Sequence, residues 1–336
     1  SSPIRAFTDM DYSSVGLDIV SDVSSAEVLI GVKEVPIEAL IPNKSYFFFS
    51  HTIKKQPYNR NLLQAILDKN ITLYDHETLV NKFHHRLIGF GYYAGVVGAY
   101  NGFRALGLKL NSFKLPKANT LVDRLALNKQ LDQINIPSVK IILTGTGRVG
   151  QGAKEILDHL NIKQVSVNQF LNDKFEEAVY VQLDVLDYCE RHDGMSIGKK
   201  DFFESPKAYK SIFDRFTKIA DFFIAGHYYG KDAPVFFTRE QAKASSFNLK
   251  VVADISCDID GPVACTIRPS TIEDPIYGYD PQSESEVDYR DPNAIAVMAV
   301  DNLPCELPKD ASEVFGEIFV KTILPSFFNA DAFGVL

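Results

Sequence analysis

The feature that most constrains the fold of this chain is a glycine-rich turn near its middle. Residues 139–150, VKIILTGTGRVG, join an apolar run typical of a buried strand to the spacing G-x-G-x-x-G. Residues 151–160 then carry apolar side chains at helical spacing. A strand, a glycine turn and a helix in this order form the phosphate-binding corner of dinucleotide-binding α/β domains. The sequence therefore predicts a domain that binds a dinucleotide.

Each glycine of the turn has its own expected role. Gly145 allows the tight turn, Gly147 lets backbone amides approach a pyrophosphate, and Gly150 lets the helix pack close to the strand. The helix N-terminus adds unpaired N–H groups and a partial positive charge. The predicted cofactor contacts of this segment are Gly145, Thr146, Gly147, Arg148, Val149 and Gly150.

Strand and helix patterns alternate on both sides of the turn. In the first half, strands are expected at 26–32, 45–50, 72–74 and 86–91, and helices at 59–69 and 94–106. In the second half, strands are expected at 163–167, 178–182, 221–225, 249–254 and 294–300, with a polar surface loop at 280–293. Such alternation is typical of α/β folds with parallel sheets.

We therefore expect an α/β fold with two Rossmann-like, doubly wound parallel-sheet domains. The expected substrate domain comprises residues 1–105 and 302–336, and the expected dinucleotide-binding Rossmann domain comprises residues 106–301. The amphipathic segment 308–328 is predicted to be helical and to return to the first domain, with 301–304 as the second hinge.

Composition excludes several other classes of protein. The formal net charge of −8 is a poor match to a nucleic-acid binder. No apolar run reaches membrane-spanning length, so no membrane association is expected. The four cysteines are widely spaced and form no C-x-x-C pattern, which favours reduced thiols in a cytoplasmic protein over a disulfide framework or a zinc site.

The choice between NAD and NADP stays open at this level. Dinucleotide domains usually place an acidic residue about 20 positions past the glycines, where it binds the ribose hydroxyls. Here the predicted second strand ends at Asn168, which carries no carboxylate but is the cofactor contact predicted for this position. Arg148 suits a 2′-phosphate and a solvated turn equally well.

Ionisable side chains follow several predicted strands of the first half. Lys33 and His51 come directly after two apolar strands, and Glu77 and Arg86 follow further strand ends. Ligands of open α/β sheets bind outside the carboxyl ends of the strands, so these groups are candidates for one cleft. Lysine and histidine are common proton-transfer groups, and arginine can bind a carboxylate bidentately. A solvated loop lysine and a helix-capping histidine are the alternatives.

Three acidic residues follow the predicted strand 249–254, namely Asp254, Asp258 and Asp260. One loop of acids without histidine is weak support for a metal site, so we expect no metal. We favour Asp258 as a group near a nicotinamide ring or a substrate amine.

Seven blocks occur here in the order found in saccharopine dehydrogenases, and together they span nearly the whole chain. The blocks are GVKEVP, YFFFSHTIKKQ, LYDHE, RLIGFGYYAGVVGA, LTGTGRVGQGA, ADISCDIDG and VDNLPCELPKDAS. The chain thus resembles the saccharopine dehydrogenases and lysine–2-oxoglutarate reductases, a branch of the alanine dehydrogenase and transhydrogenase superfamily. The resemblance implies an NAD- or NADP-dependent oxidoreductase that converts saccharopine to lysine and 2-oxoglutarate, or the reverse.

The resemblance also implies roles for individual residues. Lys33 and His51 match the acid/base pair, and Glu77 matches the carboxylate that tunes it. Implied substrate contacts are Arg86, Phe90, Lys54 and Gln56. Implied groups around the nicotinamide ring are Asp258, Asp301, Asn302 and Leu303.

Two departures from the family pattern leave alternatives open. Family members carry a substrate-binding arginine on a strand upstream of the position of Ser1, and these 336 residues lack it. Residues 188–217 have no counterpart in the compact fungal-type enzymes. An alanine dehydrogenase-like enzyme, another opine dehydrogenase and a non-catalytic dinucleotide-binding protein are the alternative functions. A homodimer is an assembly that the sequence leaves open.

Overall fold

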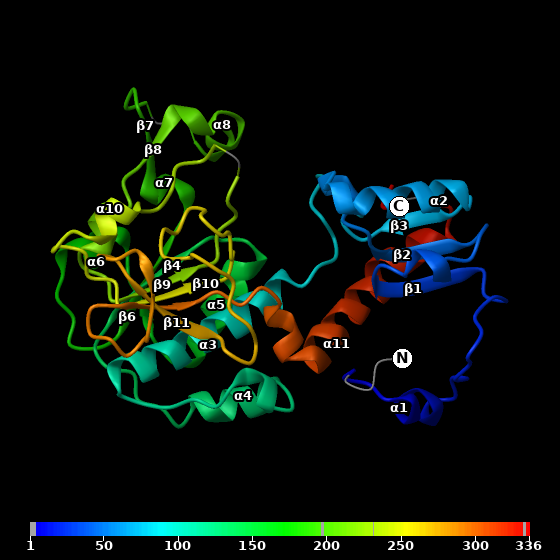
Figure 1. Ribbon diagram of the computed structural model, residues 1–336, viewed down its shortest axis with the longest axis horizontal. Coiled ribbons are helices and arrows are strands. Elements are labelled where there is room, and N and C mark those ends of the chain that lie inside the picture. The colour runs from blue at the N-terminus through cyan, green and yellow to red at the C-terminus, as the bar shows by residue number, and fades with distance from the viewer. Residues whose placement is uncertain (1–4, 196–197, 231, 332–333) are drawn as a thin grey trace. The chain divides into compact units, whose positions relative to one another are not determined.

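The computed structural model describes residues 5–195, 198–230, 232–331 and 334–336 (Figure 1). The chain divides into two compact units. Unit 1 comprises Ser1–Phe90 and Pro308–Leu336, and unit 2 comprises Gly91–Leu307. In the described part of the chain, no helix has the length and apolar character needed to cross a membrane.

Unit 1 contains a three-stranded parallel sheet in the order β1-β2-β3. Its strands are β1 (Val28–Lys33), β2 (Ser45–Phe49) and β3 (Thr72–Asp75). Its helices are α1 (Asp9–Ser14), α2 (Arg60–Asp68), α11 (Pro308–Ile318) and α12 (Leu324–Phe328), with a π-helical turn at Phe319–Ile323 between the last two.

Both faces of strand β2 are buried, as is usual for a parallel sheet between helices. Phe47 belongs to one core cluster with Phe319 and Ile323, which come from the C-terminal helical segment. Phe48 belongs to a second cluster with Ile66 of α2. The predicted return of the C-terminal helix to the first domain is therefore confirmed.

Unit 2 contains an eight-stranded sheet in the order β12-β11-β13-β10-β9-β4-β6-β5. The parallel strands are β4 (Lys140–Thr144), β5 (Lys163–Gln164), β6 (Val179–Leu183), β9 (Phe222–Ala225), β10 (Val251–Asp254) and β13 (Ile295–Met298). Strands β11 (Ile276–Asp280) and β12 (Ser285–Val287) add an antiparallel edge. A separate two-stranded ribbon is formed by β7 (Cys189–Arg191) and β8 (Tyr209–Ser211).

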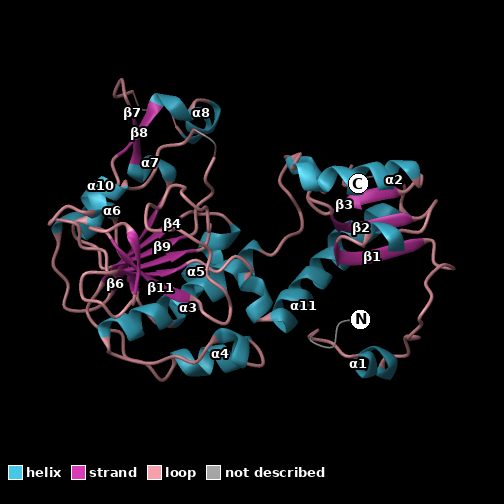
Figure 2. Cartoon of the chain, viewed as in Figure 1, coloured by secondary structure: helices cyan, strands magenta, loops and turns pink. Residues whose placement is uncertain are grey.

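Helices cover both faces of this sheet (Figure 2). The helices of unit 2 are α3 (Gly91–Leu110), α4 (Arg124–Leu131), α5 (Arg148–His159), α6 (Val167–Asn172), α7 (Val185–Tyr188), α8 (Lys199–Glu204), α9 (Asp214–Thr217) and α10 (Arg239–Ala242). Helix α3 packs along α5 and against β10. On the opposite face, a continuous apolar row runs across the strands through Val181, Ile142, Phe223, Val252 and Val297.

The α/β fold with parallel, Rossmann-like sheets is thus as predicted, but three local predictions are wrong. Residues 86–91 form no strand and contribute only an isolated bridge between Val80 and Arg86. The expected loop 280–293 contains β12, whose polar residues suit an exposed sheet edge. The expected strand 163–167 is shorter, because α6 already begins at Val167.

The two compact units also meet at other positions than the expected domain boundaries at 105 and 302, since unit 1 ends at Phe90 and resumes at Pro308. Both positions lie inside unit 2. The physical reason is that α3 packs on α5 and β10 over its length, so the whole helix belongs to the larger unit.

Glycines at the α3–α5 contact allow the two backbones to touch. A Cβ atom at Gly95 would lie 2.0 Å from the Val149 carbonyl oxygen, and one at Gly152 would lie 2.0 Å from the Tyr92 carbonyl oxygen. Neither backbone group can move away without separating the helices. We expect Gly95→Ala to destabilise the protein by at least about 1–3 kcal/mol, the usual cost of overpacking. Denaturant unfolding followed by circular dichroism measures this change.

Gly316→Ala is the matched control for this prediction. Gly316 also lies within a helix, α11, and a Cβ atom there meets no atom within 4 Å. Alanine favours the helix over glycine by up to about 1 kcal/mol, so Gly316→Ala should be neutral or stabilising. Equal stability of the Gly95→Ala variant and the parent protein would contradict the close helix contact.

Candidate functional site

A cavity of about 220 Å³ opens at the carboxyl ends of the unit 1 strands. Most of its lining is ionisable or aromatic. The lining residues are Lys33, Phe49, His51, Lys54, Glu77, Arg86, Gly89 and Phe90. The predicted acid/base and arginine residues are therefore brought together. Gln56 is the exception, since it is exposed, does not line the cavity and accepts a hydrogen bond from Tyr58 at 2.5 Å.

The parallel strands explain why residues far apart in the sequence meet here. Lys33 ends β1 and is paired in register with Phe49, the last residue of β2, after an irregularity in β1. His51 follows with φ of 56°, in the left-handed region, and begins a short 3-10 turn at Thr52–Lys54. The turn directs the chain back across the strand ends, so that Lys54 also reaches the cavity.

Glu77 is the charge centre of this cavity. Its side chain is only 8% exposed, and its carboxylate lies 3.2 Å from His51 Nδ1, 3.7 Å from Lys54 Nζ and 3.9 Å from Arg86 Nη1. The His51 approach is short but not aligned as a hydrogen bond. A buried carboxylate is costly unless cations or donors surround it, and these three groups meet that need.

A hydrogen-bond network below the cavity joins the ends of β2 and β3. Ser50 donates to the Asp75 carboxylate, which also accepts from the Glu77 backbone N–H at 2.9 Å. The Ser50 and Thr52 hydroxyls are 2.7 Å apart. Because Asp75 bonds to both strand ends, it fixes Glu77 and the turn after His51 relative to each other.

His76 lies next to the site. It is part of the sequence block LYDHE, but no role was predicted for it from the sequence. Its side chain is fully buried, and Nε2 lies 3.0 Å from the carbonyl oxygen of Gly31 in β1. Burial lowers the pKa of His76, while the Gly31 carbonyl acts in the opposite direction. A neutral ring that donates to the Gly31 carbonyl therefore links the end of β3 to β1. Its place among the aromatic rings of unit 1 could not be read from one sequence.

The glycine turn of unit 2 has the geometry that the motif predicts. Gly145 has φ of +93°, and a Cβ atom there would lie 2.3 Å from the Gly226 carbonyl oxygen. A Cβ atom at Gly150 would lie 2.1 Å from the Gly145 carbonyl oxygen, whereas one at Gly147 would meet no atom within 4 Å. The fold thus requires glycine at positions 145 and 150, whereas no protein atom lies close to the side-chain position of Gly147. Thr146, Arg148 and Val149 complete the turn and the first residues of α5.

The predicted position of Asn168 is wrong. Asn168 does not end a strand, since it lies inside α6, whose N-cap is Ser166, and it accepts hydrogen bonds from the Asn172 side chain. The reason is the lateral order of the sheet. Strand β6 lies between β4 and β5, so the second strand in sequence is two places away from the glycine turn.

The other predicted cofactor contacts follow β10 and β13, which are neighbours in the sheet. Asp258 follows β10, and partial burial raises the pKa of its carboxyl. Asp301 and Asn302 follow β13 and are exposed, whereas Leu303 is buried. These residues share the carboxyl edge of the sheet with the glycine turn.

Asp254 has a structural environment of its own. Its carboxylate is fully buried and accepts hydrogen bonds of 2.6 Å from both Ser256 and Thr266. Within the described ranges, no three histidine, cysteine or acidic side chains are grouped so that they could hold a metal ion.

Two buried ionisable residues of unit 2 escaped the sequence analysis. His227 follows β9, with Nδ1 3.2 Å from Thr144 Oγ1, and burial lowers its pKa to about 3. Glu306 accepts a hydrogen bond of 2.8 Å from Asn101, and burial raises its pKa to about 7. His227 lies two residues after an apolar strand, and this position in the sequence could have indicated a functional residue. No pattern in the sequence indicates that Glu306 is buried.

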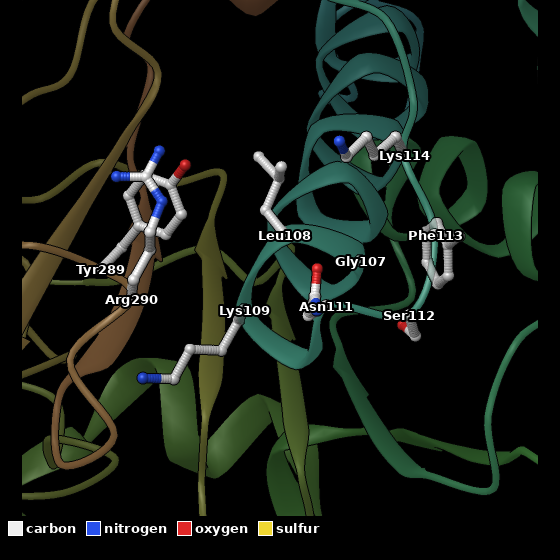
Figure 3. A pocket seen from close by; sticks show the side chains of 9 residues that line it. All are labelled: Gly107, Leu108, Lys109, Asn111, Ser112, Phe113, Lys114, Tyr289 and Arg290. Carbon is white, nitrogen blue, oxygen red and sulfur yellow. The ribbon is translucent and has the colours of Figure 1, made fainter.

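Unit 2 also contains a larger cavity, of about 530 Å³, whose lining residues are shown in Figure 3. It is formed by the last residues of α3, the segment after them, and Tyr289 with Arg290. Gly91 at the start of α3 contacts Val149 of the turn, and α3 is about 30 Å long at 1.5 Å per residue. This cavity is therefore at the opposite edge of the sheet from the strand ends described above.

The sequence is similar to one protein family and to several known enzymes. The family model described as alanine dehydrogenase/PNT, N-terminal domain, matches residues 2–97. Over 94% of this chain, the alpha-aminoadipic semialdehyde synthase of Arabidopsis thaliana is 28% identical and that of Bos taurus is 29% identical. The saccharopine dehydrogenase [NAD(+), L-lysine-forming] of Yarrowia lipolytica is 24% identical over 96% of this chain and 82% of its own length.

This chain is thus similar in sequence to saccharopine dehydrogenases and alpha-aminoadipic semialdehyde synthases, and residues 2–97 match the alanine dehydrogenase/PNT N-terminal domain. It spans about a third of the length of the alpha-aminoadipic semialdehyde synthases that it matches. Among solved structures, an L-alanine dehydrogenase matches 98% of this chain and 82% of its own with a TM-score of 0.60 and 15% identity. The transhydrogenase from Sinorhizobium meliloti matches 96% of this chain and 81% of its own with a TM-score of 0.55 and 15% identity. Both show the same α/β fold.

The stability of the protein should depend on pH through Glu306. The pKa of Glu306 rises from its ordinary value of 4.5 to about 7 on folding, so the unfolded chain loses this proton first as pH rises. Stability should therefore fall as pH rises from about 4.5 to about 7, by on the order of 3 kcal/mol. Glu306→Gln keeps an acceptor for Asn101 and should remove this loss. Denaturant unfolding at several pH values measures the free energy of unfolding. The same dependence of this free energy on pH in Glu306→Gln as in the parent protein would refute the role of Glu306.

The glycine turn gives a second prediction. Gly147→Ala adds a methyl group that meets no protein atom, so its thermal stability should be that of the parent protein. If a dinucleotide pyrophosphate approaches this backbone, the same methyl group should weaken binding by about tenfold or more. Gly150→Ala should instead destabilise the fold, because its methyl group collides with the Gly145 carbonyl. Thermal unfolding and dinucleotide titration separate the two effects, and equal affinity of Gly147→Ala would contradict this use of the turn.

Proposed function

We propose that this chain is an oxidoreductase that uses NAD or NADP to act on the CH–NH group of an amino acid or opine. The reaction that we assign is saccharopine, water and oxidised dinucleotide to lysine, 2-oxoglutarate, reduced dinucleotide and a proton, in either direction. The sequence relationship to saccharopine dehydrogenases and to alpha-aminoadipic semialdehyde synthases supports this assignment.

The observation that carries the proposal is the charge of the unit 1 cavity. Lys33, Lys54 and Arg86 line the cavity together with one buried carboxylate, that of Glu77, so positive charge exceeds negative charge among the lining residues. A cavity with this balance attracts and orients polycarboxylates. Saccharopine carries three carboxylates and 2-oxoglutarate carries two, whereas alanine and pyruvate carry one each. The charge balance therefore favours the larger, more acidic substrate.

The residues of unit 2 suit a dinucleotide. The N-terminus of α5 and the open space at Gly147 fit a pyrophosphate, and Gly145 and Gly150 hold the turn in place. The bound nicotinamide would accept the hydride from the substrate α-carbon. Asp258, Asp301, Asn302 and Leu303 follow the ends of β10 and β13, and we assign them to the surroundings of its ring.

The residues of unit 1 would perform the proton transfers. Nδ1 of His51 is buried against Glu77, which leaves Nε2 for exchange with the substrate amine or with water. Lys33 is the second proton-transfer group at the same edge. One of the pair would take the proton of the secondary amine, and the pair would then serve the water that attacks the imine. Arg86 and Lys54 would hold substrate carboxylates, and Phe90 would pack beside them.

The alternative substrates are a smaller amino acid, such as alanine, and another opine. The fold shared with an L-alanine dehydrogenase is compatible with the first alternative, a smaller amino acid. The deciding experiment follows absorbance of the reduced nicotinamide with lysine plus 2-oxoglutarate, and separately with pyruvate plus ammonia. Oxidation with the first pair alone supports the proposal. Oxidation with the second pair alone would replace it with an alanine dehydrogenase function.

Substitution of the proton-transfer groups should lower turnover without loss of structure. We expect Lys33→Met and His51→Asn each to reduce turnover by about 100- to 10,000-fold, the range typical of general acid–base groups. Asparagine is chosen for residue 51 because it tolerates the left-handed backbone found there. Steady-state kinetics and thermal unfolding are measured for each variant.

His85→Ala is the matched control, because His85 lies in the same unit, is exposed and does not line the cavity. Its turnover should equal that of the parent protein. Parent-like turnover in both Lys33→Met and His51→Asn would remove this pair from the mechanism.

A further inference from the structure

The lateral order of strands in unit 2 departs from the usual dinucleotide-binding sheet. In that sheet the strand order is 3-2-1-4-5-6, so the second strand lies beside the first, which carries the glycine turn. Here β4 carries the turn, and its neighbour on that side is β6, the third strand in sequence. The short β5, second in sequence, is at the edge.

The end of β6 is bonded directly to the glycine turn. Gly145 N–H donates to the Leu183 carbonyl at 3.1 Å, and the Gln182 side chain donates to the Gly145 carbonyl at 2.9 Å. The next residue is Asp184. It therefore occupies the place that, in the usual sheet, belongs to the acidic residue at the end of the second strand.

We propose that Asp184 contacts the adenosine ribose of the cofactor and makes this chain prefer NAD to NADP. The inference rests on the proposed dinucleotide-dependent function and adds the identity of the cofactor. In the usual sheet, the carboxylate at this position accepts hydrogen bonds from the ribose hydroxyls. A 2′-phosphate would instead bring about 1.5–2 negative charges against that carboxylate.

The carboxylate of Asp184 is held in place and still has capacity for a ligand. It accepts a hydrogen bond of 2.6 Å from the Val185 backbone N–H and pairs with Lys199. The Asp187 carboxylate in turn accepts from the Asp184 backbone N–H at 2.8 Å. A carboxylate has about four acceptor sites, so these contacts leave room for ribose hydroxyls. The Asp184 side chain is 29% exposed, which leaves it accessible to a ligand.

The same contacts suggest a use for the segment that has no counterpart in the compact fungal-type enzymes. Lys199 is the first residue of α8, which belongs to that segment with the ribbon of β7 and β8 (Figure 1). The segment follows β6, so it leaves the sheet at the edge where Asp184 lies. Its ion pair with Asp184 holds the carboxylate and, at the same time, occupies the lysine that would otherwise suit a 2′-phosphate.

The test measures affinity rather than activity. The full chain is titrated calorimetrically with NADH and with NADPH at one salt concentration. We expect the parent protein to bind NADH at least about tenfold more tightly, as expected for loss of hydrogen bonds to a charged group. In Asp184→Asn, NADH should bind more weakly and NADPH more tightly, so that the ratio falls about tenfold or more. Asparagine is an equally good N-cap for α7, which protects the local fold.

Asp123→Asn is the matched control. Asp123 is also an N-cap aspartate of unit 2, since it accepts from Ala126 N–H at 2.9 Å, but it precedes α4 and is remote in sequence from the strand ends. Both affinities should be unchanged in this variant. Adenosine 5′-diphosphate and its 2′-phosphorylated counterpart should show the same contrast without the nicotinamide half.

Each other outcome has a definite meaning. Tighter binding of NADPH by the parent protein, with loss of that binding in Lys199→Met, would overturn the inference and make Lys199 a phosphate ligand. An unchanged affinity ratio in Asp184→Asn would also overturn it. Binding of neither dinucleotide by the folded parent protein would refute the proposed function and this inference together. The predicted affinities without turnover would refute only the proposed reaction.

Discussion

The contact between α3 and α5 is the constraint on which the geometry of unit 2 depends. The two helices meet backbone to backbone, because Gly95 and Gly152 each lie against a main-chain carbonyl of the other helix. Helix α3 is in turn held on the sheet, where Gly102 lies against Ala253 and Phe222. The start of α5 therefore has one position relative to β4. Since the glycine turn joins β4 to α5, its shape follows from the packing of the helices as much as from its own residues.

In unit 1 the candidate site depends on the arrangement of charged side chains, not on close contacts between backbones. Three strand ends deliver Lys33, His51 and Glu77 to one edge, and the turn after His51 adds Lys54. Asp75 below them accepts hydrogen bonds from Ser50 and from backbone N–H groups, and Glu77 is the carboxylate that faces the cations. The result is a cavity whose excess positive charge is supported by hydrogen bonds that a substrate need not disturb. This arrangement suits a polycarboxylate better than a neutral or singly charged ligand.

The sequence predicted what depends on local pattern and missed what depends on neighbours in space. Apolar runs identified most strands of both sheets, and the glycine spacing located the turn at Gly145, where the positive φ requires glycine. The extended reading of residues 86–91 failed because apolar residues there fill a core as loop residues, with Ile88 fully buried. The burial of Glu306 depends on Asn101, which is 205 positions away, and no pattern in a single sequence reports such a contact.

The order of β5 and β6 shows how a missed spatial relation changes a chemical conclusion. The second strand in sequence after the glycines points to Asn168 as the ribose-binding position, and Asn168 lacks a carboxylate. The strand that lies beside the glycine turn in the sheet is instead followed by Asp184. A signal for this was present in the residues themselves. Strands inside a parallel sheet are apolar almost throughout, as VYVQL at 179–183 is, while the segment at 163–167 alternates with polar residues and suits an edge. The strand beside a glycine turn is therefore better chosen by its burial than by its place in the sequence, and the ribose contact that we propose for Asp184 rests on that choice.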